Sequence, residues 1–247
     1  TLLFKMGYEL IKTHDLVLCQ PNCLEDMFGM IEKNIFFFRD EEKFEGPIVI
    51  GVDSIATLQT GAEDEGDYDD QHMGLTARII HQGLRKVMGH VARKKIVLIF
   101  LNQYRYTMAR YGDEFATTGG RGIPIRASLR IRLSNKKADI VMKGRTPVGV
   151  HTDAFMFKNK IAVPYKTARY FFNFKTGIDK ISDLWESALT IGLLKATSGG
   201  NFKLNKDTII RREQWEEYIT KKFKSVEKCK ESLLQQAIKR GFITPYK

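Results

Sequence analysis

Two patterns of apolar and polar residues take turns along the first two thirds of the chain. Dense apolar runs at residues 48–52 and 96–101 show no alternation, which is typical of strands buried on both faces of a parallel sheet. Residues 23–33 and 74–92 instead repeat apolar side chains at helical spacing. The apolar triplet at 16–18 predicts one more short strand. This alternation of strands and helices along the chain predicts an α/β domain.

The next part of the chain alternates strictly. From Ile125 to Leu133 every second residue is apolar, and the residues between are arginine or serine, so we predict a strand with one apolar and one basic face. Runs near 154–163 and 168–174 predict two further strands of the same sheet.

Beyond Gly177 the pattern becomes mostly helical, with helices predicted at 181–196 and, with a possible break, at 211–240. The predicted organisation is therefore an α/β core over residues 1–176 and a small, mainly helical carboxy-terminal domain over 177–247.

Charge divides the chain unevenly. Residues 1–120 hold 13 Lys and Arg against 18 Asp and Glu, a balance of −5, whereas residues 121–247 hold 27 against 11, a balance of +16. Such an asymmetry suggests a polyanionic partner for the second half, although basic faces are often only solvated. Three cysteines do not make a disulfide framework, and no apolar run reaches the ~20 residues of a membrane helix. We expect a protein of the reducing cytoplasm without a membrane partner.

Two strand ends carry candidate chemistry. Asp53 follows the strand 48–52, and a carboxylate at the carboxyl end of such a strand is how nucleotide-hydrolysing α/β proteins hold Mg²⁺, there indirectly through the nucleotide. Gln103 follows the strand 96–101, where an uncharged amide can hydrogen-bond a phosphate or orient water. Taken singly, an aspartate at a strand end is more often a simple cap, and a glutamine there is more often a buried side chain satisfied by backbone.

The order of several motifs resembles the RecA family of recombinases, including its phage members, from about Met6 to Gly192. The resemblance is carried by LVLCQP, IVIGVDSIATL, the loop ending in HMGLTAR, LIFLNQ, TTGG, FKNKIAVPYK and GIDKISDLWESALTIGLL. It implies a RecA-like nucleotide-hydrolysing core and a first and second DNA-binding loop at about Glu63–Gly74 and Tyr104–Gly120. The implied DNA-binding residues are Met73, Arg78, Arg105, Arg110, Tyr111, Thr117, Thr118, Gly119 and Gly120.

The chemistry of the second loop agrees with this assignment. Arg105 and Arg110 can neutralise phosphates, tyrosines and a methionine offer surfaces to unstacked bases, and Gly119 and Gly120 allow a phosphate to approach the backbone closely. The resemblance also implies that Gln103 relays the state of bound ATP to this loop.

Other implied contacts lie further along the chain. Lys158 and Lys160 match the pair that reaches the ATP of a neighbouring subunit, so ATP and Mg²⁺ would act within a helical homo-oligomeric filament. Lys221, Lys222 and Lys224 lie on a predicted tail helix that Trp215, Ile219 and Phe223 would dock, and in the family this domain meets incoming double-stranded DNA.

One part of the family pattern is missing. A phosphate-binding loop needs Gly-x-x-x-x-Gly-Lys-Ser/Thr, and the chain contains no Gly-Lys dipeptide. We therefore interpret the chain as the carboxy-terminal portion of a recombinase: the intact parent would be a DNA-dependent ATPase, and this chain alone would be inactive. Ile125 also stands where bacterial members carry an aromatic residue that packs across the filament interface.

The expected function is homologous recombination and DNA repair, through ATP-dependent filament formation on single-stranded DNA, homology search and strand exchange. Two alternatives remain open. One is a non-hydrolysing DNA-binding or filament-capping paralogue. The other is a related ring helicase, which has no reason to carry HMGLTAR and FKNKIAVPYK.

Overall fold

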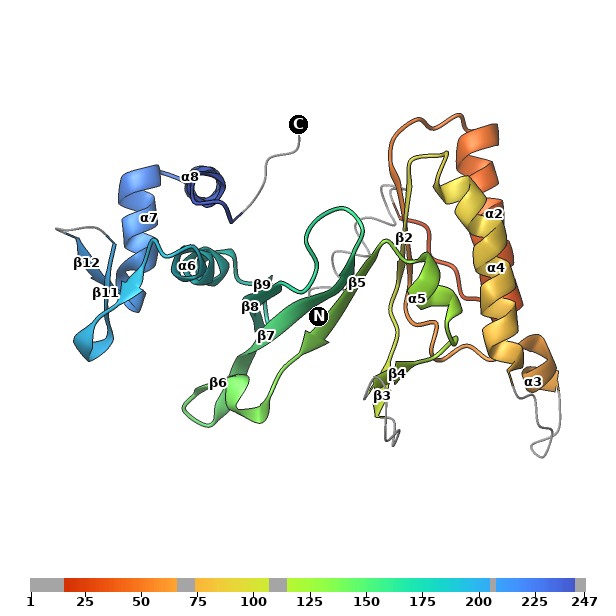
Figure 1. The fold of residues 1–247 in the computed structure, drawn as a ribbon, viewed down its shortest axis with the longest axis horizontal. Helices are drawn as coiled ribbons and strands as arrows, with labels where there is room; N and C mark the ends of the chain where they lie inside the picture. The colour runs from red at the N-terminus through yellow and green to blue at the C-terminus, as the bar shows by residue number, and fades with distance from the viewer. Residues whose placement is uncertain (1–15, 66–73, 107–114, 205–207, 243–247) are drawn as a thin grey trace. The chain divides into compact units, whose positions relative to one another are not determined.

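A computed structural model describes residues 16–65, 74–106, 115–204 and 208–242 (Figure 1). Contacts divide the chain into two compact units, one within residues 10–128 and the other including residues 129–247. Each unit has a hydrophobic cluster of its own. Helices and strands are mixed in both, which confirms the α/β class, and no described helix is long and apolar enough to cross a membrane.

The first unit is built on a pair of parallel strands. Its elements are α2 (Leu24–Phe36), a π-helical turn (Phe37–Glu41), β1 (Ile48–Val52), α3 (Gly61–Glu65), α4 (Leu75–Val91), β2 (Ile96–Phe100), β3 (Tyr104–Tyr106), β4 (Phe115–Thr117) and α5 (Gly122–Arg126). Strands β1 and β2 pair in parallel from Ile48↔Ile96 to Val52↔Phe100. The strands and helices predicted for this region are therefore confirmed to within three residues at each end, apart from those noted below.

One face of the β1–β2 pair is covered by helices. Side chains of α2 and α4, among them Ile35 and Ile80, form a closed cluster with that face, and the two helices run side by side in Figure 1. On the opposite face Val49 is 65% exposed and Val97 is 51% exposed. Only one face of these strands is therefore packed within the described residues, although the sequence pattern predicts burial on both.

The predicted strand at 16–18 is not a strand in the structure. Val17 is 53% exposed and Leu18 is 70% exposed. Instead of pairing with β1, this segment lines one side of a groove of about 780 Å³ that runs along that strand. Three apolar residues in a row do not show whether a second strand is available to pair with them. A strand forms only where a second strand completes its backbone hydrogen bonds.

The second unit begins with an antiparallel sheet. It comprises β5 (Leu129–Ser134), β6 (Ile140–Lys143), the long β7 (Thr146–Asn159), β8 (Thr167–Asn173) and β9 (Gly177–Ile178). Its order is β5–β7–β8–β9, with β6 also paired to β7. Strand β6 has no counterpart among the predicted strands, and β7 begins earlier than expected.

The predicted strand 125–133 is only partly correct. Residues Gly122–Arg126 form the helical turn α5, so the strand begins at Leu129. The predicted apolar and basic faces are both present, and the apolar one is the more exposed: Ile131 is 52% exposed, whereas Arg130 lies 4.8 Å from the ring centre of Phe157 and is half-buried. The arginines of β5 thus cover aromatic rings of β7. The alternation of apolar and basic residues in the sequence did not show which face of the strand would be the more exposed one.

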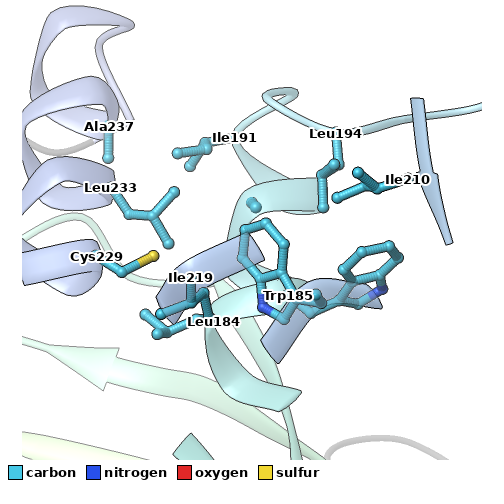
Figure 2. Close-up of a cluster of buried hydrophobic side chains, with 11 residues drawn as sticks. Leu184, Trp185, Ile191, Leu194, Ile210, Ile219, Cys229, Leu233 and Ala237 are labelled. Carbon is cyan, nitrogen blue, oxygen red and sulfur yellow. The ribbon is translucent and has the colours of Figure 1, made fainter. Parts of the chain in front are cut away.

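The carboxy-terminal part of this unit packs around two tryptophans. It contains α6 (Lys180–Thr190), β10 (Lys195–Ala196), β11 (Asn201–Lys203), β12 (Ile209–Arg211), α7 (Trp215–Phe223) and α8 (Val226–Lys239), together with single 3₁₀ turns at Lys137–Asp139, Ser198–Gly200 and Arg212–Gln214. The rings of Trp185 and Trp215 meet edge to face, with their centres 5.4 Å apart. Figure 2 shows the buried cluster around Trp185. Side chains of α6, α7 and α8 complete it, and Trp215 is only 1% exposed. The small sheet β10–β11–β12 was not predicted, and its first strand occupies the end of the expected helix 181–196.

Two local signals define the helix ends of this cluster. Asp179 caps α6 by accepting hydrogen bonds from the backbone N–H groups of Ile181 and Ser182. Lys224 separates α7 from α8 with a left-handed backbone, φ 62°. The predicted break between residues 211 and 240 is confirmed at this point.

Candidate functional site

The ends of the two parallel strands are held together by the backbone of Leu101. Its N–H donates to the Val52 carbonyl at 2.9 Å, and its carbonyl accepts from the Ile55 N–H at 3.1 Å. The turn that carries Asp53 is therefore hydrogen-bonded to the residue that precedes Asn102-Gln103. Strand ends of a parallel pair meet at one edge, so both candidate residues lie at the same edge of this sheet.

The surroundings of Asp53 suit a single carboxylate ligand and not a metal site enclosed by several protein ligands. Its side chain is exposed, and within the described ranges no group of three or more His, Cys, Asp or Glu side chains could hold a metal ion. Mg²⁺ in nucleotide sites is usually held by one or two carboxylates, with water and phosphate oxygens completing the shell. A single exposed aspartate at a strand end fits that role.

Beyond Gln103 the chain forms a hairpin stem. Strand β3 pairs antiparallel with β4, from Tyr104↔Thr117 to Tyr106↔Phe115. Tyr104 and Arg105 are exposed on this stem. Backbone pairing therefore brings the start of the candidate second loop next to its Thr117–Gly120 end.

Asn102 adds a second connection across the same stem. Its Nδ2 donates to the Thr118 carbonyl at 2.9 Å, and its Oδ1 accepts from the Gln103 N–H at 2.8 Å. One side-chain amide thus bonds both the backbone of the candidate switch residue and the turn at the far end of the loop.

That turn lies against helix α4. Gly119 (φ 91°) and Gly120 (φ 59°) both have left-handed backbones, which glycine adopts without strain. A Cβ atom on Gly119 would lie 2.8 Å from Cδ1 of Ile80, and one on Gly120 would lie 3.2 Å from Cβ of Ala77. Gly119 is therefore required by close packing and by backbone conformation, independently of any ligand, and a side chain on Gly120 would be tight against Ala77. Arg78, exposed on α4, is adjacent to Ala77 in the sequence.

The first candidate loop is closed at its base by Glu63. The Thr60 N–H donates to Glu63 Oε2 at 2.8 Å, and the Thr76 hydroxyl donates to Oε1 at 3.1 Å. This carboxylate links the start of α3 to the first turn of α4. Met73, Arg110 and Tyr111, which were assigned to DNA binding from the sequence, lie outside the described residues.

The two candidate ATP-binding lysines are in the second unit. Lys158 lies near the end of β7 and is half-buried, and Lys160 follows it and is exposed. Desolvation lowers the pKa of Lys158, and the nearby charges of Lys160 and Arg130 lower it further. Asn159, between the lysines, accepts hydrogen bonds at 2.9 Å from the N–H groups of the two residues that follow Lys160, which bends the chain there.

Comparison with known proteins decides the family. The model of the RecA N-terminal domain matches residues 6–179, more than two thirds of the chain. The chain belongs to the RecA family. Protein RecA of Clostridioides difficile is 37% identical over 197 residues, which are 79% of this chain and 53% of that protein. Protein RecA of Wolbachia from Culex pipiens is 34% identical over 186 residues, 75% of this chain and 50% of that protein.

A similar match is found in Thermus thermophilus, whose protein RecA is 34% identical over 187 residues, 75% of this chain and 52% of the relative. The chain therefore spans about half the length of the curated relatives it matches. The RecA resemblance seen in the motifs is confirmed, and with it the fold class.

The tail lysines of this RecA relative have local partners. Lys221 pairs with Glu217 at 2.6 Å, and the ammonium of Lys222 lies 5.3 Å from the ring centre of Tyr218. All three lysines on this side, Lys221, Lys222 and Lys224, are exposed. Of their predicted apolar anchors, Trp215 and Ile219 belong to the buried cluster of this unit, and Phe223 packs against it.

Asn102 and Glu63, which connect the ends of the two candidate loops, were not among the residues predicted for the site. The sequence offered one signal for Asn102, its position directly before Gln103 at a strand end. For Glu63 the signal was the spacing Thr60-x-x-Glu63, a capping box before a short helix.

Proposed function

We propose that this chain belongs to a recombinase of the RecA family. The whole protein would act in homologous recombination and DNA repair, as a DNA-dependent ATPase that forms filaments on single-stranded DNA, searches for homology and exchanges strands. The observation that carries the proposal is the link between Gln103 and the Thr118–Gly120 turn: the end of a sheet strand is joined by a hairpin and a side-chain amide to a glycine turn.

Single-stranded DNA is assigned to the β3–β4 stem and the turn after it. Arg105 supplies a positive charge for a phosphate and Tyr104 an exposed ring for a base. Gly120 is exposed, so its backbone is open to a phosphate, whereas Gly119 is buried against Ile80 and supports the turn from behind. Arg78 on α4 and Thr117 on β4 are further proposed contacts.

Nucleotide is assigned to the neighbouring strand ends. Asp53 would reach Mg²⁺ through water or nucleotide oxygens, and the metal would neutralise charge on the phosphates. Gln103 would sense the terminal phosphate and pass its presence to the hairpin that begins at the next residue. Because the sequence contains no Gly-Lys dipeptide, we propose that this chain does not hydrolyse ATP by itself.

The second unit supplies proposed contacts between subunits and with duplex DNA. Lys158 and Lys160 would reach the ATP bound by a neighbouring subunit, so that hydrolysis requires a filament. Lys158 suits this role because the positive charges of Lys160 and Arg130 lie near it, and together they would attract a phosphate. Lys221, Lys222 and Lys224 are proposed to meet incoming double-stranded DNA.

The proposal is tested by completing the chain with a segment that carries a phosphate-binding loop and measuring ATP hydrolysis with and without single-stranded DNA. We expect hydrolysis that depends on DNA, and Gln103→Ala should remove that dependence while leaving the protein folded. Calorimetry on residues 1–247 alone should show no micromolar MgATP binding. Tight MgATP binding by the unsupplemented chain, or DNA-independent hydrolysis by the completed protein, would contradict the proposal.

A further inference from the structure

The Asn102 side chain occupies a position where it contacts two segments that are distant in the sequence. Its Nδ2 donates to the carbonyl of Thr118, sixteen residues further on, at 2.9 Å, and its Oδ1 accepts from the N–H of the next residue, Gln103, at 2.8 Å. Both lengths are those of good N–H···O hydrogen bonds. The side chain is half-buried, and both ends of its amide are used.

The two segments that it joins are each fixed on their other side. Just before Asn102, the backbone of Leu101 is hydrogen-bonded to Val52 and Ile55. Just after Thr118, the backbone of Gly119 lies so close to Ile80 that a Cβ atom there would come within 2.8 Å of it. The amide therefore bridges the sheet edge and the turn that packs on helix α4.

We propose that Asn102 is a positioning residue that couples the backbone of Gln103 to the Thr118–Gly120 turn. A displacement of Gln103 would move the Asn102 oxygen with it, and the same rigid amide would carry the Thr118 carbonyl. The relay needs a side chain that donates at one end and accepts at the other, and asparagine is the shortest residue that does so. Its consequence for DNA binding rests on the proposed function of the turn.

Two substitutions separate the two bonds. Asn102→Ala removes both. Asn102→Asp keeps an acceptor for the Gln103 N–H, but an ionised carboxylate cannot donate to the Thr118 carbonyl and repels it. Asn34→Ala is the matched control, because Asn34 on α2 also donates its Nδ2 to a backbone carbonyl, that of Met30, at 2.8 Å.

The direct test is amide hydrogen exchange by NMR on the labelled chain. In Asn102→Ala we expect the Gln103 amide to exchange about tenfold faster, the effect of losing one ordinary hydrogen bond, and the Gly119 and Gly120 amide signals to shift. In Asn102→Asp the Gln103 protection should remain while the glycine signals still shift. Asn34→Ala should change neither set.

Unchanged Gln103 exchange and unchanged glycine signals in Asn102→Ala would overturn the inference. So would a glycine shift in that variant that Asn102→Asp does not reproduce. Binding of a fluorescent dT 30-mer gives the second readout: Asn102→Asp should weaken it severalfold although Gln103 stays protected. If the wild-type chain binds no oligonucleotide, the proposed function fails, but the exchange data still decide whether Asn102 couples the two segments.

Discussion

Replacing Gly119 with alanine should destabilise the first unit by an amount that the structure allows to be worked out. The new Cβ atom would lie 2.8 Å from Cδ1 of Ile80 and 3.2 Å from Cδ1 of Ile123. Ile80 is 0% exposed, so its side chain has no solvent to move into. Overpacking of this kind costs about 1–3 kcal/mol, and a left-handed backbone (φ 91°) adds about 1–2 kcal/mol for any residue with a Cβ. We expect a total of roughly 2–5 kcal/mol.

Gly74→Ala isolates the backbone contribution. Gly74 also has a left-handed backbone, φ 79°, but nothing lies within 4 Å of its Cβ position. The measurement is hydrogen exchange of the β2 amides by mass spectrometry, which reports opening of this unit. Gly119→Ala should speed this exchange about 5- to 150-fold more than Gly74→Ala does. That ratio corresponds to the overpacking cost of about 1–3 kcal/mol.

A double-mutant cycle then tests the named contact. Ile80→Val removes Cδ1 at a cost of about 0.5–1.5 kcal/mol of its own, and in that background Gly119→Ala should become less costly by about 1 kcal/mol or more. Equal effects of the two glycine substitutions, together with additivity in the cycle, would refute the close packing of the turn on α4.

Three further predictions concern the second unit. The pKa of Asp139 is lowered mainly because its carboxylate accepts a hydrogen bond from the backbone N–H of Lys136. A carboxyl group with a lowered pKa stabilises the fold at pH values above its unfolded pKa, about 3.9. This stabilisation is lost as the pH falls through the folded pKa. Asp139→Asn should therefore lower the urea midpoint at pH 7 but not at strongly acidic pH. Burial raises the pKa of Cys229 to about 11, so iodoacetamide at pH 8 should modify exposed Cys19 long before Cys229, as peptide mass spectrometry would show. Ile219→Ala, at a side chain 1% exposed, should cost about 2–5 kcal/mol by tryptophan fluorescence while leaving β2 exchange unchanged.

The elements that the sequence predicted well are those whose pattern is set by their own burial. Helix α4 and the strands β1 and β2 were placed to within one residue of their observed ends. The buried face of each element is visible in the spacing of its own apolar residues. The break between α7 and α8 was also found.

The elements that the sequence missed depend on distant partners. The β3–β4 stem has no apolar rhythm, since backbone pairing defines it and its residues are largely polar or aromatic. The segment 16–18 has a strand's composition without a strand's partner. Helix α5 replaced the start of the apparently regular strand 125–133. The helix contains Pro124, a residue tolerated in the first turn of a helix.

The candidate site divides in the same way. Asp53 and Gln103 were found because strand ends are visible in the sequence, and their placement at one edge follows from the parallel pairing; their roles stay predictions. The contact of Asn102 with Thr118 spans sixteen residues and needs the hairpin register, which no spacing in the sequence specifies.

The most direct test of the account is the fluorescence anisotropy of a labelled dT 30-mer titrated with the chain at several salt concentrations. We predict binding that weakens steeply with salt, and Arg105→Glu should weaken it about tenfold or more and reduce the salt slope by at least about 0.7, the share of one phosphate contact. Arg93→Glu makes the same charge change in the same unit, beyond the opposite end of α4 from Ala77, and should leave the slope unaltered. Equal losses in the two variants, or no binding by the wild-type chain at low salt, would contradict the assignment of the hairpin to single-stranded DNA.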